Sequence, residues 1–328
     1  MRIAIVRLSA LGDIIQSMIV LQFIKKRFPD SSIDWFVDSQ FANLLDGCPD
    51  IDNIISLNIK EIKKKKSISQ LFKTLRKLRR IKKYDQVFDL QGLIKSAIIT
   101  RFIPAEERIG FDRKSVREKL ATYFYSKKYY FPYHQNVIER YTGLIASSLK
   151  IEINSLDIDE KRPFFNLSQT RFANNEPNIV IILGASFKSK IYPVDKYAQI
   201  VESLQANFIA LWHSKEEFKM AKKLSSLSDR VSIVKSQSFY TLKKIIINSD
   251  LIIGGDTGPT HIAWALNKSS ITIFGATPIQ RNCFVTKKNL AISPGNKVNP
   301  YKINRKDFSI RDISSSEISL LAKRLLNL

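Results

Sequence analysis

Short apolar runs alternate with amphipathic segments through the first half of the chain. The apolar runs predict buried strands at 2–6, 33–37, 53–57 and 86–90. Between them, apolar residues recur at helical spacing, which predicts helices at 14–27, 68–83 and 93–102. Regular alternation of strand and helix predicts a mainly parallel sheet with helices on both faces.

A second series of the same kind begins at residue 178. Its strands are predicted at 178–183, 208–211, 231–234, 251–253 and 271–274, and its last helix at about 315–326. Residues 151–178 interrupt the alternation with an acidic patch, a proline and the turn at 174–177. We therefore expect two doubly wound, Rossmann-like α/β domains with a ligand cleft between them.

The domain boundaries follow from this interruption. We expect an N-terminal domain over 1–165, a linker over 166–178, and a C-terminal domain over 179–310. The remaining segment, 311–328, is expected to hold the last helix, for which packing back on the N-terminal domain is one option.

The net charge of the 328-residue chain is +23, which favours an anionic partner. Residues 60–128 concentrate this charge, with 21 Lys and Arg against 7 Asp and Glu. Nucleic acid, an anionic membrane surface and phosphorylated substrates all fit. The basic helix near 67–83 is either a solvated helix face or a surface for anionic lipid headgroups.

Several classes of site are not supported by the sequence. The two cysteines, Cys48 and Cys283, lie far apart, which argues against a disulfide framework or a cysteine zinc site. There is no HExxH pattern and no Walker A loop. The N-terminal apolar run is broken by charged residues, so it predicts a strand rather than a secretory signal. No apolar run reaches the roughly 18 residues of a membrane-spanning helix, so we expect a cytoplasmic protein.

The loop at 254–258 joins a predicted strand to a predicted helix and is rich in glycine. Pro259 suits the first position of that helix, with Gly258 just before it. Backbone N–H groups, the hydroxyls of Thr257 and Thr260 and the positive end of the helix dipole would meet there and attract phosphate. A tight corner closed by glycines is the alternative, and the spacing alone does not separate the two.

Asp13 follows the first predicted strand, and loops at that end of a strand face the ligand crevice. It is either the N-cap of the next helix or a general base that takes a proton from a hydroxyl. No DxD pair flanks the glycine loop, so a magnesium-held diphosphate has no obvious ligands.

Other candidates follow strands of the second series. Lys188 and Lys190 either neutralise a diphosphate or are solvated surface residues. Glu216 and Glu217 either start a helix or accept hydrogen bonds from a ribose. His261 lies just after the glycine loop, where it caps, packs or donates to a phosphate oxygen.

Several ordered motifs, spread over nearly the whole chain, together resemble glycosyltransferase family 9, the ADP-heptose:lipopolysaccharide heptosyltransferases. They are Ser9-Ala10-Leu11-Gly12-Asp13, Asp89-Leu90-Gln91-Gly92-Leu93-Ile94-Lys95-Ser96-Ala97, Arg117-Glu118 with Leu120-Ala121, Lys190 with Tyr192-Pro193, and Gly255-Asp256-Thr257-Gly258 with His261. The Leu-Gln-Gly-Leu-Ile-Lys-Ser segment favours members that add the first heptose over later-acting ones.

The resemblance implies a GT-B fold, with the donor bound by the C-terminal domain and the acceptor by the N-terminal one. It implies that Asp13 is the catalytic base and that Lys190 stabilises the leaving diphosphate. The implied donor-binding residues are Ser186, Lys188, Glu217 (ribose), Asp256 (heptose), Thr257, Gly258 and His261 (phosphate region). The implied acceptor-binding residues are Ser9, Gly12, Gln91, Lys95, Arg113 and Arg117.

The reaction implied is an inverting transfer of heptose from ADP-L-glycero-D-manno-heptose to Kdo of Kdo-lipid A, with ADP as product and no metal or other cofactor. We expect a monomer, peripheral on the cytoplasmic face of the inner membrane, with no nucleic-acid partner. The alternatives are transfer to a later core sugar or from another nucleotide sugar, a basic nucleic-acid-binding protein with a nucleotide-binding fold, and a catalytically idle binding module.

Overall fold

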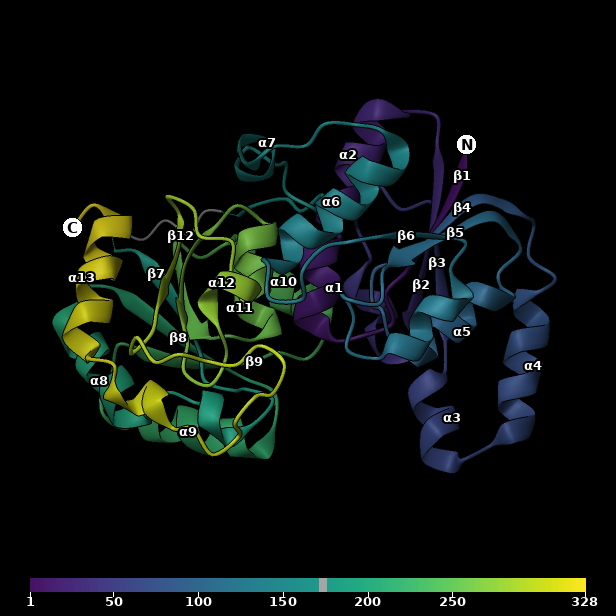
Figure 1. The fold of residues 1–328 in the computed structure, drawn as a ribbon. Helices are drawn as coiled ribbons and strands as arrows, with labels where there is room; N and C mark the ends of the chain where they lie inside the picture. Colours follow the sequence, from purple (N-terminus) through teal and green to yellow (C-terminus); the bar gives the residue numbers. More distant parts are fainter. Residues whose placement is uncertain (171–175) are drawn as a thin grey trace. The chain divides into compact units, whose positions relative to one another are not determined.

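The computed structural model describes residues 1–170 and 176–328, and the chain forms two compact units, Met1–Asn166 and Leu167–Leu328 (Figure 1). Each unit contains one six-stranded sheet in which every pair of neighbouring strands is parallel. The predicted α/β class with two doubly wound sheets is confirmed. Part of the expected linker, residues 171–175, lies outside the described residues.

The N-terminal sheet has the strand order β3-β2-β1-β4-β5-β6. Its strands are β1 (Arg2–Val6), β2 (Ser32–Asp38), β3 (Asn53–Leu57), β4 (Tyr84–Asp89), β5 (Ala105–Phe111) and β6 (Lys127–Tyr129). Its helices are α1 (Leu11–Ser17), α2 (Ile19–Arg27), α3 (Ile59–Lys65), α4 (Ile68–Leu78), α5 (Ile94–Phe102), α6 (Val137–Leu149) and α7 (Ser155–Asp159). Short 3-10 turns cover Ser39–Leu44 and Lys119–Phe124.

The C-terminal sheet has the order β12-β11-β10-β7-β8-β9, which is the same topology counted from its own first strand. Its strands are β7 (Asn178–Ile182), β8 (Asn207–Trp212), β9 (Val231–Lys235), β10 (Leu251–Gly255), β11 (Ser269–Ile273) and β12 (Asn289–Ile292). Its helices are α8 (Val194–Ser203), α9 (Lys215–Ser225), α10 (Phe239–Ile247), α11 (Gly258–Ala265), α12 (Ile279–Asn282) and α13 (Ser315–Leu326), with 3-10 turns at Lys188–Lys190 and Ser309–Asp312.

In both sheets the strand order reverses beside the first strand. In the N-terminal unit β1 pairs with β4, so that Val6 lies opposite Asp89. In the C-terminal unit β7 pairs with β10, so that Ile182 lies opposite Gly254. At such a topological switch point the two connecting loops diverge and leave a crevice outside the carboxyl ends of the strands. The loops after β1, β4, β7 and β10 are therefore where ligands are expected.

The helix predicted over 14–27 begins earlier and is divided. Ala10 is the extended N-cap residue and α1 begins at Leu11, so the prediction that Asp13 begins the helix is wrong. Asp13 is the third helical residue, from which a carboxylate can reach back to the N-cap amide. Met18 lies between α1 and α2, and its N–H donates to the carbonyls of both Ile14 and Ile15.

The helix predicted over 68–83 ends at Leu78, since the chain must turn before β4 starts at Tyr84. The preceding helix α3 was not predicted, because its lysine-rich sequence offers little apolar periodicity. Lys66 has a left-handed backbone conformation (φ 49°) and connects α3 to α4.

The last helix, α13, matches the predicted bounds and packs within the C-terminal unit. It contacts α8, β10 and β11. Ile318 and Ala322 are fully buried in the core of that unit, together with Ile310 and Ile313 from the preceding turn. These contacts place α13 in the C-terminal unit.

Candidate active site

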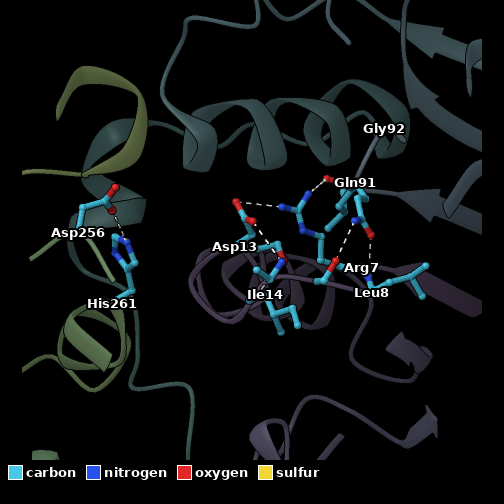
Figure 2. Close-up of polar contacts among 12 residues, drawn as sticks. Arg7, Leu8, Asp13, Ile14, Gln91, Gly92, Asp256 and His261 are labelled. Carbon is cyan, nitrogen blue, oxygen red and sulfur yellow. Dashed lines mark hydrogen bonds and ion pairs between the residues drawn. The ribbon is translucent and has the colours of Figure 1, made fainter. Parts of the chain in front are cut away.

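Asp13 occupies the crevice edge of the N-terminal sheet, where β1 leads into α1. One carboxylate oxygen accepts a hydrogen bond from the N–H of Ala10 at 3.2 Å. The other lies 3.0 Å from the Arg7 guanidinium, and 44% of the Asp13 side chain is exposed. The carboxylate is thus fixed on two sides while still open to solvent (Figure 2). Each of its oxygens retains a lone pair for a further donor.

Arg7 is the buried partner that holds Asp13. Its guanidinium donates to the carbonyl of Leu90 at 2.6 Å and lies over the Tyr141 ring, 5.4 Å from the centroid. These contacts tie Arg7 to the end of β4 and to α6. Sequence reasoning missed this residue. The sequence offered one indication of its role. Arg7 is a charged residue directly after the apolar run of β1, where burying a cation without a partner would be energetically costly.

Ser9, Gln91 and Lys95, three of the residues expected to bind the acceptor, are joined to one another by hydrogen bonds. The side-chain oxygen of Gln91 (Oε1) accepts a hydrogen bond from the N–H of Leu8 at 2.9 Å, and its side-chain nitrogen (Nε2) donates to the Ser9 hydroxyl at 3.2 Å. The Lys95 ammonium donates to the same hydroxyl at 2.7 Å. Burial, followed by the charges of Arg7 and Lys63, lowers the pKa of Lys95, while nearby carboxylates oppose the shift. Gly12 lies close by, in the first turn of α1.

Asp89 stabilises the turn that carries Gln91. Its carboxylate accepts from the N–H groups of Gln91 and Gly92, at 2.8 and 3.1 Å, and from the Tyr125 hydroxyl at 2.7 Å. Burial raises the pKa of Asp89 although these donors oppose the shift. Gly92 has φ +67°, and a Cβ there would lie 2.8 Å from Val116 Cγ1, so this turn requires glycine. The carboxylate therefore fixes the backbone that presents Gln91.

Arg113 and Arg117 are exposed on the loop that follows β5. Two contacts shape this loop: the Asp112 carboxylate accepts from the backbone N–H and hydroxyl of Ser115, and the Glu118 carboxylate accepts from the N–H of Ile94 at 2.7 Å. The loop is thereby connected to the start of α5, the helix that carries Lys95. Both arginines remain available to an anionic ligand.

In the C-terminal unit, Asp256 follows β10 and is the centre of a buried polar cluster. One of its oxygens is 2.8 Å from the Lys190 ammonium and accepts from the Thr277 hydroxyl at 2.8 Å and the Asn282 amide at 3.3 Å. The other lies 3.0 Å from His261 Nε2 (Figure 2). Burial alone would raise the pKa of Asp256, but Lys190 and His261 outweigh it and hold this pKa well below its usual range.

The cluster also distinguishes residues that the sequence left as alternatives. Lys190 is buried against Asp256, whereas Lys188 and Ser186 are exposed. His261 is directed to Asp256 in the structure. Thr277 and Asn282 were missed, because nothing in their local sequence links them to the glycine loop. Cys283 lies beside them, and burial together with the Asp256 charge raises the pKa of its thiol to about 12.

The glycine loop leads into α11 as predicted. Thr257 is the extended N-cap residue and Gly258 the first helical residue, so Pro259 is the second. The prediction that Pro259 takes the first position, with Gly258 before the helix, is therefore wrong by one residue. The Thr260 hydroxyl donates to the carbonyl of Gly255 at 2.9 Å. A Cβ on Gly255 would lie 2.7 Å from the Lys190 carbonyl oxygen, so glycine allows the Lys190 turn to approach β10. The N-terminus of α11 and the Lys190 ammonium are thus brought to one edge of the sheet, where they favour an anion.

Glu217 lies near the end of β7, across from the glycine loop at the switch point. Its carboxylate accepts from the N–H groups of His213 and Ser214, at 2.6 and 3.1 Å, in a capping box at the start of α9. It also packs so closely on Gly184 that a Cβ there would overlap it. Glu216 is exposed, so Glu217 is the carboxylate that faces the strand ends.

The residues that the structure describes lack two kinds of feature. They contain no group of three or more His, Cys, Asp or Glu residues arranged to hold a metal ion. Nor does any helix among them combine the length and the apolar character needed to cross a bilayer.

Several known proteins are similar to this chain over most or all of its length. Residues 69–307 match the family described as glycosyltransferase family 9 (heptosyltransferase). The chain is 39% identical to lipopolysaccharide heptosyltransferase 1 of Campylobacter coli, covering 99% of both chains. It is 28% identical to lipopolysaccharide heptosyltransferase 1 of Pseudomonas aeruginosa, covering 84% of this chain and 79% of the other.

The solved structure of E. coli heptosyltransferase WaaC with ADP has a TM-score of 0.82 at 21% identity, covering 99% of this chain and 100% of that one. This likeness confirms the expected GT-B fold. Taken with the family match and the full-length identity, it shows that the chain is a glycosyltransferase and belongs to glycosyltransferase family 9, the heptosyltransferases.

Proposed function

We propose that this enzyme transfers heptose from ADP-L-glycero-D-manno-heptose to Kdo of Kdo-lipid A, in lipopolysaccharide inner-core synthesis, with inversion at the anomeric carbon. The observation that carries the proposal is the placement of Asp13. A partly exposed carboxylate, fixed by a buried arginine and a helix N-cap amide, lies at the switch point beside Ser9, Gln91 and Lys95. This is what a general base for a sugar hydroxyl requires.

In the proposed reaction the Kdo hydroxyl oxygen attacks the anomeric carbon of the heptose. Asp13 takes the hydroxyl proton as the new C–O bond forms. The bond between the anomeric carbon and the diphosphate oxygen breaks, and its electron pair leaves with ADP. Attack opposite to the leaving group inverts the configuration. Arg7 keeps the Asp13 carboxylate oriented through its contact at 3.0 Å.

The donor is assigned to the C-terminal unit. The N-terminal amides of α11 at Thr257 and Gly258, together with Lys190, would stabilise the charge that develops on the diphosphate. Glu217 would accept from the ribose hydroxyls and Asp256 would contact the heptose, with Ser186 and Lys188 at the exposed edge. His261 would act through Asp256, to which it is hydrogen-bonded. A solved relative with ADP-2-deoxy-2-fluoro heptose, E. coli heptosyltransferase WaaC, supports this class of donor.

The acceptor is assigned to the N-terminal unit. Ser9, Gly12, Gln91 and Lys95 would surround the Kdo hydroxyl, and Arg113 and Arg117 would contact the acidic groups of Kdo and lipid A. Because lipid A is held in a membrane by its acyl chains, the proposal places the enzyme on the cytoplasmic face of the inner membrane as a peripheral, monomeric protein. The reaction proposed needs no metal, since Lys190 and the α11 amides supply the positive potential.

A later core sugar is the second candidate acceptor. The similarities favour the first transfer: identity is 39% to a heptosyltransferase 1, but 23% to lipopolysaccharide heptosyltransferase 3 of Escherichia coli and 25% to lipooligosaccharide heptosyltransferase 2 of Haemophilus influenzae.

One assay tests the proposal. Purified enzyme is incubated with ADP-heptose and Kdo-lipid A in EDTA, and released ADP and the mass of the lipid product are measured. UDP- and GDP-sugars serve as donor controls, and heptosylated Kdo-lipid A serves as the acceptor control for a later transfer. Product formed only from the already heptosylated acceptor would assign the enzyme to the later step.

A further inference from the structure

The segment over residues 59–83, which forms α3, α4 and the turn into β4, is here called the basic hairpin. It contains twelve lysines and arginines and a single acidic residue, Glu61. All twelve cationic side chains are exposed. The two helices lie against each other, and α4 also packs on α5 (Figure 1). The catalytic assignments above use none of its residues.

Helix α4 has an apolar stripe that is wider than the core can cover. On one side of the stripe, Leu75 and Leu78 are buried in the core of the N-terminal unit. On the other side, Ile68 is 69% exposed and Phe72 is 66% exposed. These two residues are one turn apart and share a face of the helix. The fold therefore leaves two large apolar side chains together in water.

Positively charged residues flank Ile68 and Phe72 on α4. Arg76 continues the same row of α4, one turn beyond Phe72, and Lys73 and Lys77 occupy the adjacent row. Apolar residues flanked by lysine and arginine on one helix are the pattern of helices that lie in a membrane interface. Anionic lipids attract each nearby cation, and the apolar side chains gain by entering the acyl boundary.

We infer that the basic hairpin is the membrane-docking element of this enzyme, in which Ile68 and Phe72 enter an anionic lipid surface and the surrounding lysines and arginines contact its headgroups. The inference deepens the membrane association in the proposed function and rests on it. A second copy of the chain fits this surface poorly, because pairing two basic hairpins would bring their positive charges together.

Vesicle binding of the full chain tests the inference directly. The protein is sedimented with vesicles of phosphatidylcholine alone and of phosphatidylcholine mixed with phosphatidylglycerol. The double variant Ile68→Ser, Phe72→Ser should bind the anionic vesicles about tenfold more weakly than the unmodified chain. The control Leu320→Ser, at an equally exposed apolar residue of α13, should bind unchanged. Lys73→Gln with Lys77→Gln should weaken binding to the anionic vesicles and reduce its dependence on salt.

A fluorescent reporter separates insertion from surface attraction. Tryptophan emission of Phe72→Trp should shift to shorter wavelength with anionic vesicles and be quenched by brominated acyl chains, whereas Leu320→Trp should show neither change. Unchanged emission of Phe72→Trp, or full vesicle binding by the double serine variant, overturns the inference. So does a dimer in light scattering that the serine substitutions abolish, since the exposed pair would then bind a second copy.

The same variants separate this inference from the proposed reaction. With a Kdo acceptor that lacks acyl chains, Ile68→Ser, Phe72→Ser should turn over as fast as the unmodified chain. If no variant transfers heptose but vesicle binding follows the pattern above, the proposed reaction fails and the docking element stands.

Discussion

The ammonium of Lys190 lies 2.8 Å from the Asp256 carboxylate, and the side chains of both residues are buried. The pair connects the turn after β7 to the glycine loop after β10, the two segments that meet at the switch point of the C-terminal sheet. A diphosphate arriving at α11 would therefore find the lysine already in place, held by a carboxylate rather than by water.

Lys190→Ala should weaken ADP binding by at least tenfold, because the cation beside the α11 amides is lost. Isothermal titration with ADP measures this. Lys188→Ala, two residues away and exposed, is the matched control and should bind ADP nearly as well as the unmodified protein. If the two variants behave the other way round, the diphosphate is held by Lys188 and the buried pair is structural.

Asp256→Asn should lower the free energy of unfolding by about 3 kcal/mol at neutral pH, because it leaves Lys190 buried without a counter-charge. The pKa of Asp256 is depressed in the folded protein, so its contribution is complete above the unfolded value near 4 and is lost as the pH falls below it. The difference in melting temperature between the two proteins should therefore stay constant above about pH 4 and shrink progressively as the pH is lowered further. A constant difference at all pH values would exclude an ionised Asp256.

Asp13→Asn should fold and bind ADP-heptose normally but lose turnover by a factor of about 10² to 10⁴, the usual contribution of a general base. The asparagine keeps the shape and can still accept from Ala10, but cannot take the proton. Single-turnover measurement of transfer, with donor binding as a control, decides the question. Turnover close to that of the unmodified enzyme would assign the base to another group.

Arg7→Met should lower kcat by about a hundredfold with little change in KM for the donor, because Asp13 loses the contact that orients it. Arg7→Lys keeps the charge but not the fork that reaches both Leu90 and Asp13, so it should recover part of the loss. Melting temperatures of the two variants show whether the effect is only structural. Equal kcat losses in both variants, following equal losses of stability, would argue against a positioning role.

Glu217→Gln should weaken ADP binding about tenfold, since hydrogen bonds to a charged acceptor contribute more than those to an amide. Glu216→Gln is the adjacent exposed control. Gly184→Ala should act in the same direction as Glu217→Gln, because its methyl group would displace the Glu217 carboxylate. If ADP binds Glu217→Gln normally, the carboxylate serves only as the helix cap of α9.

The sequence predicted the fold class and the strands that border both switch points, because those strands are mostly buried and each contains adjacent apolar residues. It was less successful where a strand is short or charged. Strand β5, with the sequence Ala105-Glu106-Glu107-Arg108-Ile109-Gly110-Phe111, has no such run, and β6 has only three residues. Both strands lie toward one edge of the sheet, where side chains are less buried and fewer of them are apolar.

The candidate site was predicted in part for a similar reason. Asp13, Lys190 and Asp256 follow strong strand signals, so their place at the crevice was visible from the chain. Thr277 and Asn282 are joined to Asp256 by hydrogen bonds across the fold, and only the three-dimensional structure brings them together. The resemblance favoured Lys190 over Lys188 for the diphosphate, and the structure adds that Lys190 is buried while Lys188 is exposed.

The packing of α13 has a practical consequence for separating the two halves of the enzyme. Ile318 and Ala322 fill the core beneath the sheet that presents Asp256 and the α11 amides. An isolated C-terminal unit must therefore extend through Leu326 to fold, and deletion of the last helix should weaken the proposed donor binding although none of its residues belongs to the proposed donor site.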